Sequence, residues 1–178
     1  SEFGAERAKH QEESRTASAG MFRGGLADQS AETTKLHTAT HLLLAALRAT
    51  LGEHVAQRGS NITGERLRFD FSHGSKLSDG EIERVEAWVN EKITRNLPVN
   101  CVELPLAEAE KTGALHVFGE KYPPVVKVHY IGNSIEDSVS KEFCGGPHVA
   151  RTGELGAFKV RKEEAVSQGV RRIKATLG

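Results

Sequence analysis

The chain has 178 residues, of which 38% are hydrophobic and 27% are charged, which is the length and composition of a soluble domain with a core of its own. Lys plus Arg and Asp plus Glu both total 24, so the net charge is zero and the chain has no overall basic field that would attract nucleic acid. It has two cysteines and neither a signal peptide nor a long apolar span, and we therefore expect a reducing, cytoplasmic environment.

The chain is predicted to begin with a lead-in, residues 1–29, followed by a single folded domain over residues 30–178. Residues 4–19 are rich in Glu, Arg, Lys, Gln and Ala, which favours an exposed helix or a polar segment. In the stretch that follows, Gly24 and Gly25 allow the backbone to approach a ligand closely, although such a pair usually forms only a turn.

The first long helix is predicted over residues 31–50, with Ser30 as its N-cap and Gly52 as its C-terminal stop. Leucines supply an apolar stripe along this helix. His37 and His41 are four residues apart, so their imidazoles project from the same face, one turn apart. We expect the helix to bury its leucine side and to show the two histidines at a metal-binding edge.

A hairpin and a second long helix are predicted next. Alternating apolar and polar residues favour two strands, residues 55–62 and 65–72, around a short turn. Ser78 and Glu81 match a capping box, which begins an amphipathic helix that Pro98 ends. A short strand over residues 99–104 and a short helix over residues 107–111 follow.

The C-terminal half is predicted to be mostly strand. Residues 125–131 form the clearest strand, and a polar loop over residues 132–140 follows it. Residues 156–161 and 169–175 are predicted as two further strands, with Ala165 in the turn between them. The order of elements is neither a regular β-α-β alternation nor all-β, so the predicted fold class is α+β, with a mixed, largely antiparallel sheet packed against two long helices.

A metal site is predicted from two motifs about a hundred residues apart. Cys144 and His148 offer a thiolate and an imidazole across a turn that contains two glycines. With His37 and His41 they make three imidazoles and one thiolate, which are the ligand types that Zn²⁺ prefers, in its usual number. Each half alone is weak, since a histidine pair can be an accident of a helix face and the cysteine a buried thiol. A disulfide between Cys101 and Cys144 would use up one of the four ligands.

The ligand set narrows the chemistry. Zinc can polarise a carbonyl and hold a substrate, so hydrolysis of an activated acyl bond is the predicted reaction. A zinc protease is excluded because Thr38 stands where the H-E-x-x-H motif has its glutamate, and a deaminase because no H-x-E precedes a C-x-x-C. Neither motif contains a carboxylate, so the base would be a water on the metal, a distant residue or the substrate. A closed zinc that only stabilises the fold is the alternative.

A family resemblance covers nearly the whole chain, and it is clearest in the segments H-T-A-T-H at 37–41 and C-G-G-P-H-V at 144–149. The chain resembles the editing domain of alanyl-tRNA synthetase, which is shared with the free-standing AlaX proteins and, more distantly, with the editing domain of threonyl-tRNA synthetase. The other matching segments are residues 14–22, 54–60, 67–73, 118–122, 152–156 and 169–173.

This resemblance implies a deacylase that releases serine or glycine from the 3' adenosine of mischarged alanine tRNA, with tRNA as its partner and Zn²⁺ as its cofactor. The family's substrate-contacting glutamine falls on Gln57, and its pocket threonine falls on Thr40. The family's glycine motif near the tRNA 3' end falls on Gly24 and Gly25. Its four metal ligands fall on His37, His41, Cys144 and His148.

The chain departs from the family at Pro147, where the family usually has threonine, and this puts fine specificity in doubt. The family's aminoacylation and main tRNA-binding regions have no counterpart here, so we expect a fragment of a synthetase. Two other functions stay open: a tRNA-binding module whose zinc is only structural, and an editing domain of the threonyl type.

Overall fold

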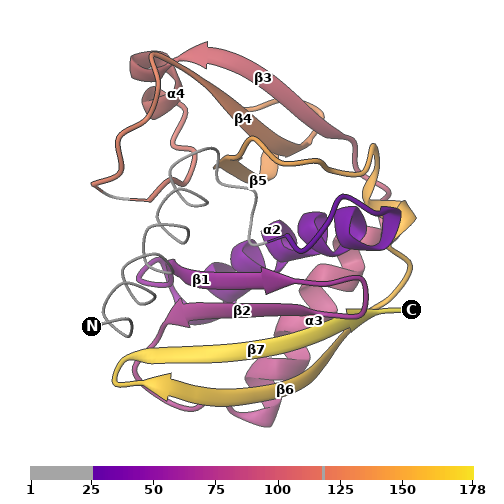
Figure 1. Ribbon diagram of the computed structural model, residues 1–178. Helices are drawn as coiled ribbons and strands as arrows, with labels where there is room; N and C mark the ends of the chain where they lie inside the picture. Colours follow the sequence, from indigo (N-terminus) through magenta and orange to yellow (C-terminus); the bar gives the residue numbers. More distant parts are fainter. Residues whose placement is uncertain (1–25, 118) are drawn as a thin grey trace, which may run out of the picture.

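The computed structural model describes residues 26–117 and 119–178 (Figure 1). Most of the predicted lead-in, including Gly24 and Gly25, lies outside these residues. Helix α2, Ala31–Leu51, begins at Ser30, whose side chain accepts a hydrogen bond from the Thr33 backbone, and it ends at Gly52 with a φ of 126°. The predicted N-cap and C-terminal stop are therefore confirmed.

Helix α3, Asp79–Thr94, has the predicted capping box: Ser78 and Glu81 exchange hydrogen bonds of 2.9 and 3.1 Å. Its buried residues recur at helical spacing, and this face packs against α2. Both long helices contact the same sheet, and α2 also contacts a strand of a second sheet. Figure 1 shows α2 between the two sheets.

The larger sheet contains β1 (Gln57–Ile62), β2 (Leu67–Ser72), β6 (Phe158–Ser167) and β7 (Val170–Leu177), in the order β1-β2-β7-β6 with antiparallel neighbours. Its inward side chains, among them Phe69 and Phe71, are fully buried against the helices. Each such side chain contributes about 1.5–3 kcal/mol by leaving water.

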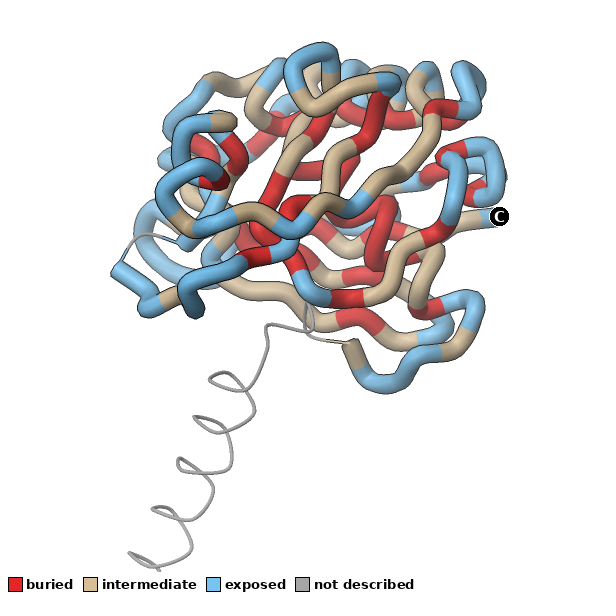
Figure 2. Tube along the Cα trace, turned by 90° about the horizontal axis from the view of Figure 1, so that it is seen from above, coloured by how far each residue is buried: buried red, intermediate tan, exposed pale blue. Residues whose placement is uncertain are grey.

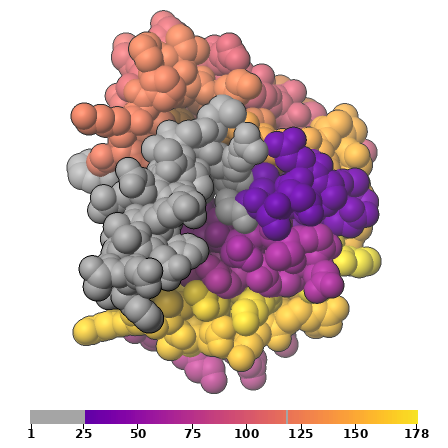
Figure 3. All heavy atoms as spheres, viewed as in Figure 1, coloured from indigo at the N-terminus to yellow at the C-terminus, as the bar shows by residue number. Residues whose placement is uncertain are grey.

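The smaller sheet contains β3 (Val99–Pro105), β4 (Val125–Gly132) and β5 (Ser138–Phe143), again antiparallel. Helix α4, Leu106–Lys111, packs on it around a separate hydrophobic cluster. In Figure 3 this sheet and α4 lie at the top of the molecule and the larger sheet at the bottom. Figure 2 shows the buried positions gathered inside these layers.

The α+β class is confirmed, and three details of the sequence prediction are wrong. The strands form two sheets instead of one, and every strand pair within them is antiparallel. The predicted polar loop over residues 132–140 contains the start of β5. Ala165 lies within β6 instead of a turn, because the turn comes at Gly169. A short 3-10 helix, η1 (Thr152–Leu155), was not predicted, and both cysteines are free.

Candidate metal centre

Helix α2 holds His37 and His41 one turn apart, with their ring centroids 5.1 Å from each other. Both residues are buried, at 1% and 7% exposure, because the histidine face of α2 is covered by the segment that follows β5. The prediction that both histidines lie on one face is confirmed. The expectation of an exposed edge is wrong, since this face is interior.

The turn after β5 brings the second pair of donors to α2. Cys144 is anchored by its backbone N–H, which donates to the Lys127 carbonyl on β4 at 3.0 Å. The Gly146 N–H then donates to the Cys144 sulfur at 3.4 Å. A Cβ atom on Gly146 would lie only 2.6 Å from Cε1 of His37, so glycine is required for the turn to approach the helix this closely.

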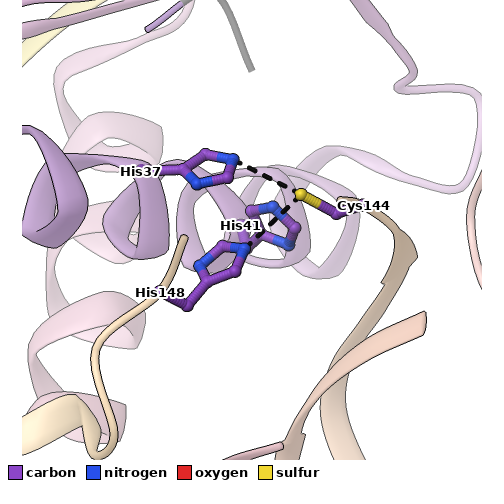
Figure 4. A group of neighbouring side chains, drawn as sticks. All are labelled: His37, His41, Cys144 and His148. Carbon is purple, nitrogen blue, oxygen red and sulfur yellow. Dashed lines mark hydrogen bonds between the residues drawn. The ribbon is translucent and has the colours of Figure 1, made fainter. Parts of the chain in front are cut away.

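The four predicted ligands meet at one point (Figure 4): their donor atoms all lie within 4.8 Å of one another. The Cys144 sulfur is 3.5 Å from Nε2 of His37 and 3.5 Å from Nε2 of His148. A tetrahedral zinc with Zn–N near 2.05 Å and Zn–S near 2.3 Å requires a sulfur-to-nitrogen distance of about 3.5 Å. The donor set can therefore hold a metal ion, and its chemistry and spacing suit Zn²⁺.

Each of the three imidazoles is held by a polar contact at Nδ1, the ring nitrogen that would not bind the metal. Nδ1 of His37 lies 2.8 Å from the Pro147 carbonyl. Nδ1 of His148 lies 2.9 Å from the Thr38 hydroxyl. These contacts favour a proton on Nδ1, which leaves Nε2 as the free donor atom, as metal-bound histidines usually have it.

The third imidazole has a charged partner: Nδ1 of His41 lies 2.6 Å from Oε2 of Glu142. Neither sequence motif contains a carboxylate, and Glu142, two residues before Cys144, was not predicted as part of the site. Side chains two apart on a strand point to the same face, and that spacing could have identified it. Thr38, considered earlier only as the residue that excludes a protease, is also part of the site.

The charges of the site favour metal binding. Burial disfavours the thiolate, but hydrogen bonds from the neighbouring imidazoles of His129, His148 and His37 outweigh it and lower the pKa of Cys144 far below that of a free thiol. Burial and the positive charge of His41 lower the pKa of His148 well below its ordinary value. Burial also opposes charge on His41, but the Glu142 carboxylate outweighs it and raises the pKa of His41 to about 10.

His129 is a fourth imidazole beside the site. It is half-buried, with its ring centroid 4.3 Å from that of His148. Its Nδ1 lies 2.7 Å from the Cys144 carbonyl. No sequence motif links this β4 residue to the site, because the link arises only from the pairing of β4 with β5.

A cavity of about 300 Å³ borders the donor set, and His37, His41 and Cys144 are part of its lining. The two residues predicted to contact substrate, Thr40 and Gln57, line the same cavity. The Thr40 hydroxyl donates to the Leu36 carbonyl at 2.8 Å, so its oxygen can still accept a hydrogen bond from a ligand. The structure thus brings six of the eight predicted site residues together, and Gly24 and Gly25 lie outside the residues it describes.

Within residues 26–117 and 119–178, no helix has both the length and the apolar character that crossing a membrane requires.

Residues 126–174 match the family described as Threonyl and Alanyl tRNA synthetase second additional domain. The chain is 57% identical to an alanine–tRNA ligase of Treponema denticola over 169 residues, which is 95% of this chain and 27% of the relative. It is 54% identical to that of Borreliella burgdorferi, over 95% of this chain and 28% of the relative. The ligase of Thermus thermophilus is 56% identical over 83% of this chain and 17% of its own length. The chain therefore spans about a quarter or less of these relatives.

Proposed function

Since residues 126–174 belong to the threonyl and alanyl tRNA synthetase second additional domain family and 95% of the chain aligns with an alanine–tRNA ligase, we propose that the chain hydrolyses mischarged alanine tRNA. The reaction releases serine or glycine: a water oxygen bonds to the ester carbonyl carbon, the bond to the 3' oxygen breaks, and that oxygen leaves with a proton.

The observation that carries this proposal is the cavity beside the four donors. Zinc, when bound by His37, His41, Cys144 and His148, would supply a Lewis acid for the ester carbonyl. The three outer hydrogen bonds fix the donor atoms before any substrate arrives, and such preorganisation is what makes electrostatic stabilisation effective. A volume of about 300 Å³ suits the aminoacyl group at the single-stranded end of a tRNA better than a folded part of the tRNA.

Thr40 and Gln57 are proposed to select serine over alanine. A hydrogen bond to the serine hydroxyl would favour serine over alanine, which lacks that hydroxyl. Glycine lacks it as well, so the release of glycine does not depend on this contact. The Thr40 oxygen retains this acceptor capacity in the cavity lining. Gln57 is half-buried there, and its amide nitrogen donates to the Ser60 hydroxyl at 3.3 Å.

The wider assignment is also part of the proposal. Residues 30–178 would form the deacylase domain, and Gly24 and Gly25 of the lead-in would contact the tRNA 3' end. The rest of an alanine–tRNA ligase would be a natural partner, since the relatives are three or more times longer. Because the proposed substrate, tRNA, is used in translation, the predicted compartment is the cytoplasm.

A purely structural zinc is the second candidate, because four protein donors fill a tetrahedral shell, as in closed structural sites.

The assay that separates the catalytic from the structural zinc measures release of serine, glycine and alanine from charged alanine tRNA by the zinc-loaded chain. Cys144→Ala is expected to lower serine release by at least about 100-fold, more than loss of an outer contact usually does. Cys101→Ala, which removes the exposed free cysteine, is the matched control and should leave the rate unchanged.

Three outcomes would contradict the proposal. A zinc-loaded wild-type chain with no deacylation above the uncatalysed rate would favour the structural zinc. Undiminished serine release by Cys144→Ala would remove the metal site from the chemistry. A preference for mischarged threonine tRNA would assign the chain to editing of the threonyl type.

A further inference from the structure

The three outer hydrogen bonds of the metal centre differ in charge. Pro147 offers a backbone carbonyl and Thr38 a hydroxyl, and both are neutral. Glu142 offers a carboxylate, 2.6 Å from Nδ1 of His41. Among residues 26–117 and 119–178, it is the only acidic side chain in an ion pair with one of the four donor residues.

Both members of this contact are shielded from water. The side chain of His41 is 8% exposed and that of Glu142 is 12% exposed. A carboxylate is costly to bury unless a positive charge lies close by. In the metal-loaded site the imidazoles are neutral ligands, so the positive charge that balances Glu142 would be that of the metal, transmitted through His41.

The charge count of the site supports this role. Zn²⁺ brings two positive charges, and the Cys144 thiolate cancels one of them. Three neutral imidazoles cancel none, so the four ligands alone would leave one net positive charge in a buried position. The Glu142 carboxylate supplies the second negative charge and makes the group neutral.

The backbone explains how Glu142 reaches this position. It lies on β5, opposite His129 of β4, and points toward α2 on the same face as Cys144. Its bond to Nδ1 also sets the ring orientation of His41, because an imidazole whose Nδ1–H is held can present only Nε2 to the donor cluster.

We infer that Glu142 is the positioning residue of the metal centre, which orients His41 and neutralises the charge of the bound metal. This inference rests on the metal site of the proposed function. It concerns affinity for the metal, so it can be tested without any tRNA.

The experiment measures zinc affinity by competition with a chromophoric chelator, for the wild-type chain and for Glu142→Gln. Glutamine keeps the size and an oxygen acceptor for Nδ1–H but removes the charge. We expect the affinity of Glu142→Gln, corrected for the proton that zinc displaces from each chain, to be about 10–100-fold lower, the usual effect of changing an outer contact. Glu142→Leu, which also removes the acceptor, should lose at least as much, and its cobalt-substituted form should show an altered ligand-field absorption because His41 is no longer oriented.

Asp70→Asn is the matched control. Asp70 is also a buried acid, 8% exposed, and it is paired with Arg172 in the other sheet by hydrogen bonds of 2.7 and 3.0 Å. It should leave zinc affinity unchanged even if it lowers stability. A general structural role of Glu142 would lower the melting temperature of the metal-free chain and leave the affinity intact.

The outcomes separate this inference from the proposed function. Equal zinc affinity of the wild-type chain and Glu142→Gln would overturn the inference and leave the deacylase proposal standing. A wild-type chain that binds no zinc would overturn both. If Glu142→Leu does not fold, the isosteric glutamine variant still decides the question.

Discussion

Gly146→Ala adds one methyl group at the point where the turn after β5 meets the His37 ring. The added carbon would lie 2.6 Å from Cε1, 3.2 Å from Nδ1 and 3.5 Å from Nε2 of that ring. Ordinary contacts begin at 3.4 Å, so the ring or the turn must move by about 0.8 Å.

His37 has no room to absorb this shift. The residue is 1% exposed, its Nδ1 is 2.8 Å from the Pro147 carbonyl, and its ring stacks on His148 at 4.1 Å. A displacement of about 0.8 Å would stretch that hydrogen bond to about 3.6 Å, at which it no longer counts as one. Metal–ligand distances tolerate only about 0.2 Å, so one imidazole would be lost from the donor set.

We therefore expect Gly146→Ala to lower zinc affinity by about 100-fold or more, beyond the range typical of outer contacts, and to cost about 1–3 kcal/mol in unfolding free energy from overpacking. Chelator competition measures the first effect and chemical denaturation of the metal-free chain the second. Gly74→Ala is the control, since no atom lies within 4 Å of its added carbon. A zinc affinity of Gly146→Ala within threefold of the wild type would refute the reasoning.

Four further predictions concern protonation, folding and selectivity. Zinc binding at pH 7 should release about one proton, because the pKa of His41 is raised to about 10 and its Nε2 must be deprotonated to bind the metal. Calorimetry in buffers of different ionisation enthalpy measures this release. A result of no proton released would mean that His41 is already neutral in the metal-free chain. The raised pKa of His41 also predicts a pH-dependent stability of the metal-free chain. The stabilisation from the charged His41 is fully present below pH 6.5 and is lost as the pH rises through about 10, and chemical denaturation at a series of pH values would measure this loss. Ser78→Ala removes the capping box of α3 and should cost about 1 kcal/mol without changing zinc affinity, and a parallel loss of affinity would contradict the separation of cap and site. Thr40→Val should slow serine release about tenfold and leave glycine release unchanged, because glycine offers no hydroxyl; equal slowing of both in the deacylation assay would argue against a selective contact.

The helices could be predicted from the sequence because their signals are local. Ser30 and Ser78 cap through contacts three residues away, and the predicted and observed starts of α2 and α3 agree. The ligand pairs were equally visible, since each lies within five residues of chain. What joins the two pairs is tertiary, and only the number and type of donors suggested that they meet.

β5 was not predicted at its full length, because two of its three buried residues are polar. Ser140 and Glu142 are 8% and 9% exposed, while Val139 between them is only half-buried. A strand that turns its polar face toward a metal centre reverses the alternation by which a half-buried strand is recognised. The same reversal concealed Glu142, which lies just beyond the predicted polar loop over residues 132–140.

The C-terminal end of β6 was missed for a different reason. Residues beyond Arg161 are mostly charged or small, and β6 is an edge strand with irregular pairing around residues 160–162 and 165–167. An edge strand needs no apolar face along its full length, because one side of its backbone is open to water. Its pairing with β7 supplies the hydrogen bonds that the sequence pattern does not reveal.

The metal centre lies where the two halves of the fold meet. His37 and His41 belong to α2, which packs with the larger sheet, while Glu142 and Cys144 belong to the end of the smaller sheet, which has a hydrophobic cluster of its own. The larger cluster reaches the smaller sheet through Ile131 of β4, but polar side chains occupy the junction at the metal centre itself, and each must find a partner there. His37 and Cys144 are 107 residues apart in the chain, and a metal held by both would connect the helical layer to the smaller sheet. Such an ion would bind only when both halves are folded and the two donor pairs face each other. Its affinity would therefore depend on the stability of the fold as well as on the geometry of the four donors.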